Sequence, residues 1–304
     1  MTVSAKVIAD SINPRGVRIT TFELNYPRII HAELLTHRVF SRNSASSRAI
    51  PVATVINLVE NDPAMPVHWG KNQAGMQASE ELNDLDKVAV QGLWLEACKQ
   101  AVSIAKIMDG IKAHKQVINR ITEPYQHMKV VVTATSYENW FWLRANKEAD
   151  PTIAALAGEM KTAYDESKPT ELRYGEWHMP YVNTAFKYAD NNPRGTQVFL
   201  DENDKEITTE EALMISASCC AQTSYRKTDG TLEKAELVFK RLIESEPVHA
   251  SPVEHQAQCF DDSYYWPVGV THRDRQGIYH SGNFKDWLQY RQLIPNNAKG
   301  SWEV

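Results

Sequence analysis

The sequence predicts an α+β fold, and two kinds of local pattern support this assignment. The segments 17–24 and 128–135 are rich in β-branched and apolar residues, which is typical of strands. Residues 79–108 instead repeat apolar side chains every three or four positions, which predicts a long helix. With 304 residues, 42% of them hydrophobic, the chain is long enough to bury one large core or two smaller ones.

The first elements in chain order lead into a polar segment. After the strand expected at 17–24, the apolar spacing of residues 28–38 predicts a helix with His37 and Arg38 at its C-terminal end. Residues 41–51, SRNSASSRAIP, lack apolar periodicity, so we expect a loop whose side chains are free to bind a ligand. Prolines, glycines and amides then predict a long surface loop at 61–77.

The later elements are mostly helical in pattern. Residues 138–144 and 151–164 are expected to form helices, the second with a proline at its start. Thr208 and Glu211 have the spacing of a capping box, which marks the beginning of another helix. A further helix is expected at about 232–244.

Residues 190–206 favour a turn or hairpin and are the best candidate for a boundary within the chain. They separate a first part, 1–190, from a second part, 206–304. We expect the second part to pack into the same domain as the first.

Charge and cysteine content restrict the class of partner. A net charge of -5 and a pI near 6.1 give no global attraction to long nucleic acid, so an anionic ligand needs a local basic cluster. The four cysteines lack Cys-x-x-Cys spacing, which fits a reducing cytoplasm. Because no signal-like segment and no run of about 18 apolar residues occurs, we expect neither export nor a membrane span.

A first group of polar residues has the chemistry of a phosphate site. A guanidinium offers a forked, permanently charged set of donors, and serine hydroxyls can complete the coordination of phosphate oxygens. The same residue types also fit a polar surface loop whose arginines are solvated. The group consists of His31, His37, Arg38, Ser41, Asn43, Ser46 and Arg48.

The stretch HRVFSRNSASSR, residues 37–48, resembles the signature of the flavin-dependent thymidylate synthases. In that family a His-Arg pair is followed at fixed offsets by Ser, Asn, Ser and Arg. The resemblance implies flavin contacts for the first part of the motif and deoxynucleotide contacts for the last part. The residues carried over are His37, Arg38, Ser41 and Asn43 for the flavin, and Ser46 and Arg48 for the nucleotide.

Two positions depart from the family pattern. Thr36 stands where the family usually has another Arg, and Ser44 stands where it usually has Glu. Both lie in the part of the motif that implies nucleotide or flavin contact. The departures leave the base open, either uracil or cytosine.

A second, shorter likeness to the same family runs from residue 120 to 144. Arg120 precedes the strand expected at 128–135, and Asn139 and Arg144 lie on the next expected helix. The resemblance implies that Asn139 contacts the flavin and that Arg120 and Arg144 contact the nucleotide. The alternative for Arg144 is a cation favoured by the dipole at the end of a helix.

A third likeness is HASPVEH at 249–255, which resembles a family segment beside flavin and folate. The family places that segment shortly before its His-Arg signature, whereas here it follows far behind, so we interpret the chain as rearranged or circularly permuted. The resemblance implies cofactor contacts for Ser251, Glu254 and His255.

The segment after it, SGNFKDWLQYRQLIP, supplies second-layer candidates for the same site. These are Asn283, Gln289 and Arg291. The alternative is an amphipathic helix with Phe284, Trp287 and Leu288 in the core.

The resemblance implies a complete reaction. Reduced FAD gives a hydride, methylenetetrahydrofolate gives a carbon, and NADPH regenerates the flavin as dUMP is methylated at C5 to thymidylate. In this scheme the flavoprotein is a methyltransferase of nucleotide biosynthesis, and Arg38, Arg48 and Arg144 stabilise charge on the activated pyrimidine. The family also implies helices packed on a mixed β-sheet and a homotetramer with sites between subunits.

Two other functions are compatible with the sequence. One is a methylase or hydroxymethylase of the same family that acts on dCMP or dUMP, and the other is a non-catalytic flavin- or nucleotide-binding homologue. We expect no metal site, because His249 and His255 lack the helical spacing of a zinc-binding pair.

Overall fold

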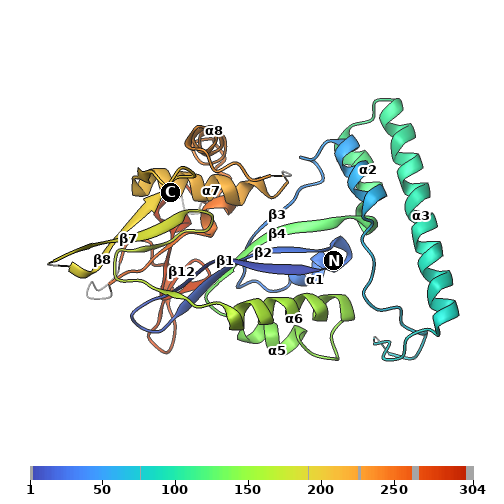
Figure 1. The fold of residues 1–304 in the computed structure, drawn as a ribbon, viewed down its shortest axis with the longest axis horizontal. Coiled ribbons are helices and arrows are strands. Elements are labelled where there is room, and N and C mark those ends of the chain that lie inside the picture. The colour runs from blue at the N-terminus through green and yellow to red at the C-terminus, as the bar shows by residue number, and fades with distance from the viewer. Residues whose placement is uncertain (1–2, 76, 191, 225–226, 262–266, 299–304) are drawn as a thin grey trace, which may run out of the picture.

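A five-stranded sheet is the centre of the protein, as the computed structural model of residues 3–75, 77–190, 192–224, 227–261 and 267–298 shows (Figure 1). The strand order is β3-β4-β2-β1-β5. All neighbouring strands run antiparallel except β1 and β5, which are parallel. The α+β class and the mixed sheet are therefore confirmed. The strands are β1 (Ser4–Ile12), β2 (Arg18–Pro27), β3 (Ser41–Ser44), β4 (His127–Ala134) and β5 (Thr170–Glu171).

One face of this sheet is apolar and is covered by the helices α5 (Glu138–Arg144) and α6 (Pro151–Glu166) (Figure 1). Side chains alternate between the two faces of a strand, so every second residue of β2 and β4 points to these helices. The main core cluster includes Phe22, Leu24, Tyr26, Val130, Val132, Trp140, Leu156 and Met160, all fully buried.

The other face is covered by the helix α7 (Thr209–Ala221) and by short elements from the C-terminal half. Among the intervening residues of β2 and β4, Thr21 and Thr133 are buried and share a hydrogen bond, whereas Ile19 and Val131 are buried and apolar. The short elements are η3 (Gln222–Ser224), η4 (Ser251–Glu254), β6 (Trp177–His178), β10 (Ala257–Gln258) and β14 (Leu288–Gln289), the last three forming a small sheet.

Three helices form a separate layer at one end of the molecule (Figure 1). They are α2 (Val52–Asn61), α3 (Asp84–Gly110) and α4 (Lys115–Ile121). Val55, Val59, Val102 and Ile118 are among the buried residues of their common core. Asn83 caps α3 by accepting a hydrogen bond from the backbone nitrogen of Asp86 at 2.9 Å.

The remaining elements are short or peripheral. The turn after β2 consists of η1 (Arg28–Ile30) and α1 (His31–Leu34), and η2 (Glu123–Tyr125) precedes β4. A second three-stranded sheet contains β7 (Asn183–Ala189), β8 (Asn192–Leu200) and β9 (Glu206–Ile207), and α8 (Leu232–Leu242) packs on α7. A third contains β11 (His272–Arg273), β12 (Tyr279–Ser281) and β13 (Phe284–Lys285), and η5 (Tyr290–Leu293) follows β14.

Several predicted elements are confirmed with small shifts of their ends. The strands expected at 17–24 and 128–135 are β2 and β4, and the helix expected at 138–144 is α5. The capping box before α7 is present, with the Thr208 hydroxyl and the Glu211 carboxylate each accepting from the other residue's backbone nitrogen.

Two predictions and one alternative interpretation are wrong for physical reasons. The helix expected at 28–38 is only one 3-10 turn and one α-turn, since the chain has to reach the sheet edge at Ser41. The loop expected at 41–51 begins with β3, because backbone pairing with β4 outweighs a polar side-chain pattern. The segment 281–295 forms short strands and a 3-10 turn instead of an amphipathic helix, although its apolar residues are buried.

Candidate functional site

The signature segment 37–48 runs along the edge of the central sheet. His37 follows the single turn of α1 and is only 7% exposed. Its ring stacks on Phe40 with centroids 5.7 Å apart and meets Trp140 edge-on at 4.7 Å. From Ser41 the chain continues as the edge strand β3. Aromatic packing therefore holds His37 where the chain turns into the sheet.

The helix α5 brings Arg144 into contact with His37. The Arg144 Nε donates a hydrogen bond to His37 Nε2 at 3.1 Å, although the two residues are 107 positions apart in the sequence. Arg144 also donates to Glu33 Oε2 at 3.2 Å and to the Thr36 hydroxyl at 3.4 Å. Burial, followed by the charges of Arg144 and Arg42, lowers the pKa of His37, so the imidazole stays neutral and accepts at Nε2. His37 thus positions a guanidinium without adding charge.

The other arginines of the predicted site present exposed guanidinium groups. Arg38 and Arg48 are both exposed, and neither has a hydrogen bond or ion pair with any residue in the described ranges. Arg120, at the end of α4, is 60% exposed and lies 3.5 Å from Glu123. Arg38 and Arg48 are therefore available to an anionic ligand, whereas Arg120 already has an acidic neighbour.

Ser41 is committed to contacts within the protein. Its hydroxyl donates to Asn283 Oδ1 at 3.1 Å and accepts from Gln289 Nε2 at 3.0 Å. Ser41 is 1% exposed. The structure thus gives Ser41 the role of joining the signature strand to the C-terminal segment.

Asn43 and Ser46 also link the signature to the C-terminal half. Asn43 Nδ2 donates to the carbonyl of Cys220 at 3.1 Å, and the backbone nitrogen of Ser46 donates to the hydroxyl of Ser224 at 2.8 Å. The Ser46 hydroxyl itself makes no hydrogen bond within the residues described. Of the serines in the predicted site, Ser46 therefore keeps a free hydroxyl, two positions from the exposed Arg48.

The segment 249–255 lies beside the signature in the fold, since η4 packs against β3. Ser251 is exposed, and the Glu254 carboxylate accepts from Arg291 Nη1. His255 is fully buried, and its Nδ1 lies 2.8 Å from the hydroxyl of Thr133. The structure brings the first and third motifs together, but the His255 side chain faces the interior of the sheet instead of the exposed arginines.

The second-layer candidates support the same edge. Asn283 Nδ2 donates to the carbonyl of Val39 at 3.0 Å, between Arg38 and Ser41, and Gln289 donates to the carbonyl of Glu254 at 3.2 Å. Asn139 lies exposed on the first turn of α5, so nothing in the described protein holds its side chain against the signature.

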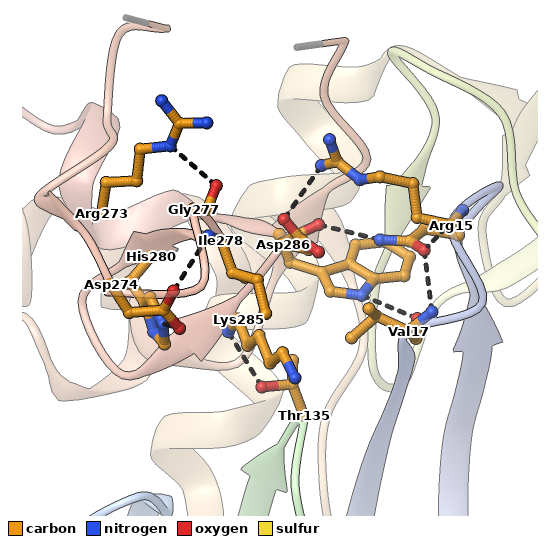
Figure 2. A network of polar contacts seen from close by, with 12 residues as sticks. Arg15, Val17, Thr135, Arg273, Asp274, Gly277, Ile278, His280, Lys285 and Asp286 are labelled. Atoms are coloured by element: carbon orange, nitrogen blue, oxygen red, sulfur yellow. Dashed lines mark hydrogen bonds and ion pairs between the residues drawn. The ribbon is translucent and has the colours of Figure 1, made fainter.

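Figure 2 shows how the hairpin that carries Asn283 is fastened to the body of the protein. The backbone nitrogen of Lys285 donates to the Thr135 hydroxyl at 2.9 Å, and Asp286 lies 3.2 Å from Arg15 (Figure 2). The next residue, Trp287, adds a third contact, since its indole nitrogen donates to the carbonyl of Val17 at 3.1 Å. The hairpin is therefore a rigid support for the signature.

A cleft of about 330 Å³ lies next to the end of the signature. Ile50, Val55, Leu58 and Val59 form its apolar wall, and Lys129 and His127 supply polar groups. Ala45 and Ser224 line the end nearest Ser46. Its volume lies at the lower end of the range of small-molecule sites, which suits one ring system of a nucleotide or cofactor.

Sequence reasoning missed Glu33 and Arg42. Glu33 pairs with Arg144, and the Arg42 guanidinium donates to the carbonyl of His37 at 3.0 Å. The signal for Arg42 was its place inside the motif, between Ser41 and Asn43. Glu33 had no local signal, because its partner is on a distant helix.

Two further properties concern membrane spans and metal sites. No helix among the described residues is long and apolar enough to cross a membrane. The described residues also contain no group of three or more His, Cys, Asp or Glu side chains that could hold a metal ion.

Comparison with known proteins gives only distant structural matches. No family model and no curated protein matches the chain. The UMP/dUMP methylase PolB from Streptomyces cacaoi, bound with 5-Br UMP, is similar over 54% of this chain and 89% of its own, with 12% identity and a TM-score of 0.44.

Flavin-dependent thymidylate synthase ThyX from Helicobacter pylori, complexed with FAD and dUMP, is similar over 48% of this chain and 67% of its own. The identity is 18% and the TM-score 0.32. ThyX is a member of the family whose signature residues 37–48 resemble. Structural likeness of this size does not indicate the activity of the chain.

Proposed function

We propose that this chain is a flavin-dependent methylase of pyrimidine nucleotides that converts dUMP to thymidylate. The observation that carries the proposal is the contact between His37 and Arg144. It joins the signature to the second motif across the fold, beside Arg38, which is exposed and has no hydrogen bond or ion pair with the described residues. A positive edge on an acidic protein is the arrangement that an anionic small molecule requires.

The residues of this edge divide the tasks of the proposal, and Arg38 serves both the nucleotide and the flavin. Arg48 and the free hydroxyl of Ser46 bind the phosphate of the nucleotide. Arg38 and Arg144 face the pyrimidine and stabilise the negative charge that develops on the activated ring. His37 is a positioning residue, since it holds Arg144 through Nε2 and remains neutral.

The residues present are compatible with FAD. Arg38 is an unpaired cation for a pyrophosphate, and the cleft beside Ser46 accepts one planar ring. When bound, reduced FAD supplies the hydride, while methylenetetrahydrofolate supplies the carbon and NADPH the reducing equivalents. A cleft of about 330 Å³ holds only part of such a cofactor set, and a homotetramer with sites completed between subunits is what the family resemblance implies.

A second candidate function differs from the first only in the base of the nucleotide or in the group that is added. The Thr36 hydroxyl lies 3.4 Å from Arg144 Nη2, where the resembled family usually has a further cation. A neutral hydroxyl at this place changes the hydrogen bonds offered to the ring, which favours dCMP as substrate or hydroxymethylation as outcome.

The test is anaerobic reduction of the purified, FAD-reconstituted protein by NADPH, with dUMP or dCMP present, followed by addition of methylenetetrahydrofolate as the carbon donor and product analysis by mass. Flavin absorbance that bleaches faster with one nucleotide, together with a product heavier by one methyl or hydroxymethyl group, supports the proposal and identifies the base. A protein that binds nucleotide but takes up no flavin and oxidises no NADPH contradicts it, and leaves a nucleotide-binding protein without this catalysis.

The same assay tests the site residues. Replacing Arg48 with Ala should weaken nucleotide binding by about 2 kcal/mol, or roughly 30-fold, because the bound phosphate loses its charged partner. Arg241→Ala, at an equally exposed arginine in the last turn of α8, is the matched control. A loss below about 0.5 kcal/mol for Arg48→Ala would place this residue outside the site.

A further inference from the structure

A second cleft, of about 640 Å³, lies at the edge of the central sheet that is opposite the signature. The signature strand β3 forms one edge of the sheet and β5 forms the other, so the two edges are roughly 19 Å apart. The turn between β1 and β2, the strand β5 and the strands β7 and β8 line this cleft. Figure 1 shows β7 and β8 at the end of the molecule away from α3. We call it the β5-edge cleft, and its lining includes Pro14, Glu171, Arg173, Phe186, Tyr188 and Arg194.

Flat apolar side chains form part of the lining. Phe186 is half-buried, since it packs against the core cluster that contains Leu172 and Trp287. Two positions further along β7, Tyr188 is 71% exposed, and its hydroxyl makes no hydrogen bond within the residues described. The ring of Pro14 adds another flat surface. Surfaces of this kind suit the face of a planar aromatic ring.

Arg173 holds the hairpin of β7 and β8 against the cleft. Its Nε and Nη2 donate to Glu176 Oε1 at 2.9 and 2.6 Å, and Nη2 also donates to the carbonyl of Gly195. Gly195 has a φ of +74°, and a Cβ atom there would lie 3.0 Å from the Cβ atom of Phe186. Only glycine fits this close approach of the two strands. The cleft is therefore shaped by contacts within the protein, which lowers the entropic cost of binding a ligand.

Two opposite charges line the β5-edge cleft without pairing. Arg194 and Glu171 are both exposed. Within the described part of the chain, neither side chain has a hydrogen bond or an ion pair, whether with the other or with a third residue. A ligand between them can therefore offer an anionic group to the guanidinium and a hydrogen-bond donor to the carboxylate.

A ribonucleotide combines the three chemical groups that this lining suits. Its base can stack on Tyr188, and its phosphate can pair with Arg194. Its vicinal ribose hydroxyls can donate to Glu171, which is how acidic side chains bind ribose in other nucleotide sites. A simple aromatic acid has no donor for Glu171, which would repel it. An aromatic amino acid has both charges but leaves most of a 640 Å³ cleft unfilled.

We propose that the β5-edge cleft binds a ribonucleoside monophosphate, with the phosphate on Arg194, the ribose on Glu171 and the base on Tyr188. The site shares no residue with the signature and lies across the width of the sheet from it. The ligand is therefore not a reactant at the signature, and the proposal is independent of the proposed function.

Calorimetric titration of the full chain tests the site. Arg48→Ala protein, in which nucleotide binding at the signature is weakened, is titrated separately with AMP, GMP, CMP and UMP. We expect at least one of them to bind. Adding Arg194→Ala should weaken this binding at least about tenfold, because the phosphate loses a charged hydrogen bond. Adding Arg241→Ala, at an exposed arginine of α8, is the control and should leave it unchanged. No binding of any of the four, or equal losses in the two variants, would overturn the proposal.

Two further substitutions test the base and the ribose separately. Tyr188→Ala should weaken binding of the same nucleotide at least about fivefold through lost stacking, whereas Tyr188→Phe should retain it. The nucleotide should bind more tightly than its 2′-deoxy form, and Glu171→Ala should remove this preference. All of these side chains are exposed, so the substitutions leave the core intact. Equal binding of both sugars by the unsubstituted cleft, or binding of free tyrosine in place of every nucleotide, would contradict the assignment.

The outcome is separate from that of the proposed function. Loss of flavin or deoxynucleotide binding at the signature leaves the dependence on Arg194 unchanged, because the two sites lie at opposite edges of the sheet.

Discussion

The two faces of the central sheet are built by opposite means. Toward α5 and α6 the sheet presents Phe22, Leu24 and Val132 to an apolar core. Toward α7 it presents Thr21 and Thr133, which join buried histidines in a chain of hydrogen bonds. The first face depends on area removed from water, and the second on hydrogen bonds between buried polar groups, although His255 Nε2 has no partner among the described residues.

The polar face is continuous from one side of the sheet to the other. His178 Nδ1 lies 2.9 Å from the Ser11 hydroxyl, and its Nε2 lies 2.8 Å from the Thr21 hydroxyl. Thr21 and Thr133 are 2.8 Å apart, and Thr133 reaches His255 at 2.8 Å. This chain links β1, β2 and β4 to segments of the C-terminal half, so it fixes where the signature strand meets its support.

The largest expected difference between the faces is in their response to acid. Burial lowers the pKa of His178 to about 3 and that of His255 to about 3. Both are neutral when folded and titrate near 6.5 when unfolded, so their contribution is complete above about pH 6.5 and is lost as pH falls toward 3. From about pH 7.5 to pH 5 the two together should cost about 4 kcal/mol in the free energy of unfolding.

Urea denaturation at the two pH values measures this loss. The variant His255→Gln should lose less on acidification than the wild type, because one of the titrating groups is gone. Exposed His272→Gln serves as control. An unchanged acid response in His255→Gln would show that other groups cause the sensitivity.

A smaller loss in the free energy of unfolding, without pH dependence, is expected from a substitution on the apolar face. Leu156→Ala, at a fully buried position of α6, should reduce the free energy of unfolding by about 3 kcal/mol through lost burial and a cavity. The reduction should be equal at both pH values, since no titrating group is touched. Glu159→Ala, exposed on the same helix, is the control. A strongly pH-dependent loss would mean that the two faces are coupled.

The smallest expected loss of stability comes from a substitution on the polar face that removes a hydrogen bond but keeps the shape of the side chain. Thr133→Val keeps the volume but removes the hydroxyl between Thr21 and His255, which should cost about 2 kcal/mol because buried partners are left unsatisfied. Thr133→Ser keeps the hydroxyl and should lose less, as thermal or urea denaturation would show. If the Thr133→Val variant is as stable as the wild type, the chain of hydrogen bonds on the polar face contributes nothing to the stability of the protein.

The comparison also shows where sequence patterns succeed. The alternation of β2 and β4 and the spacing of α6 reflect the apolar face, and these elements were predicted close to their observed ends. β1 was missed although Ser4, Ala5, Lys6 and Val7 alternate in polarity, and α2 was missed despite the spacing of Val52, Val55, Ile56 and Val59. Those two signals were present in the sequence.

The polar face had no comparable signal. Ser11, Thr21 and His178 have nothing in their local sequence that indicates a common network. His255 was expected at a cofactor, whereas its side chain lies 2.8 Å from Thr133 on the inner side of the sheet. Hydrogen bonds between distant segments depend on which segments pack together, and periodicity does not encode this.

The sequence by itself determined the α+β class, the main strands and helices, and the chemistry of residues 37–48, because each depends on neighbours within a few positions. The tertiary structure alone decided that Arg144 meets His37, that Ser41 is tied to Asn283, and that Arg38 and Arg48 stay unpaired within the described residues. These outcomes depend on packing between elements more than one hundred residues apart in the chain, where side-chain identity fixes what can bond but not which partner is within reach.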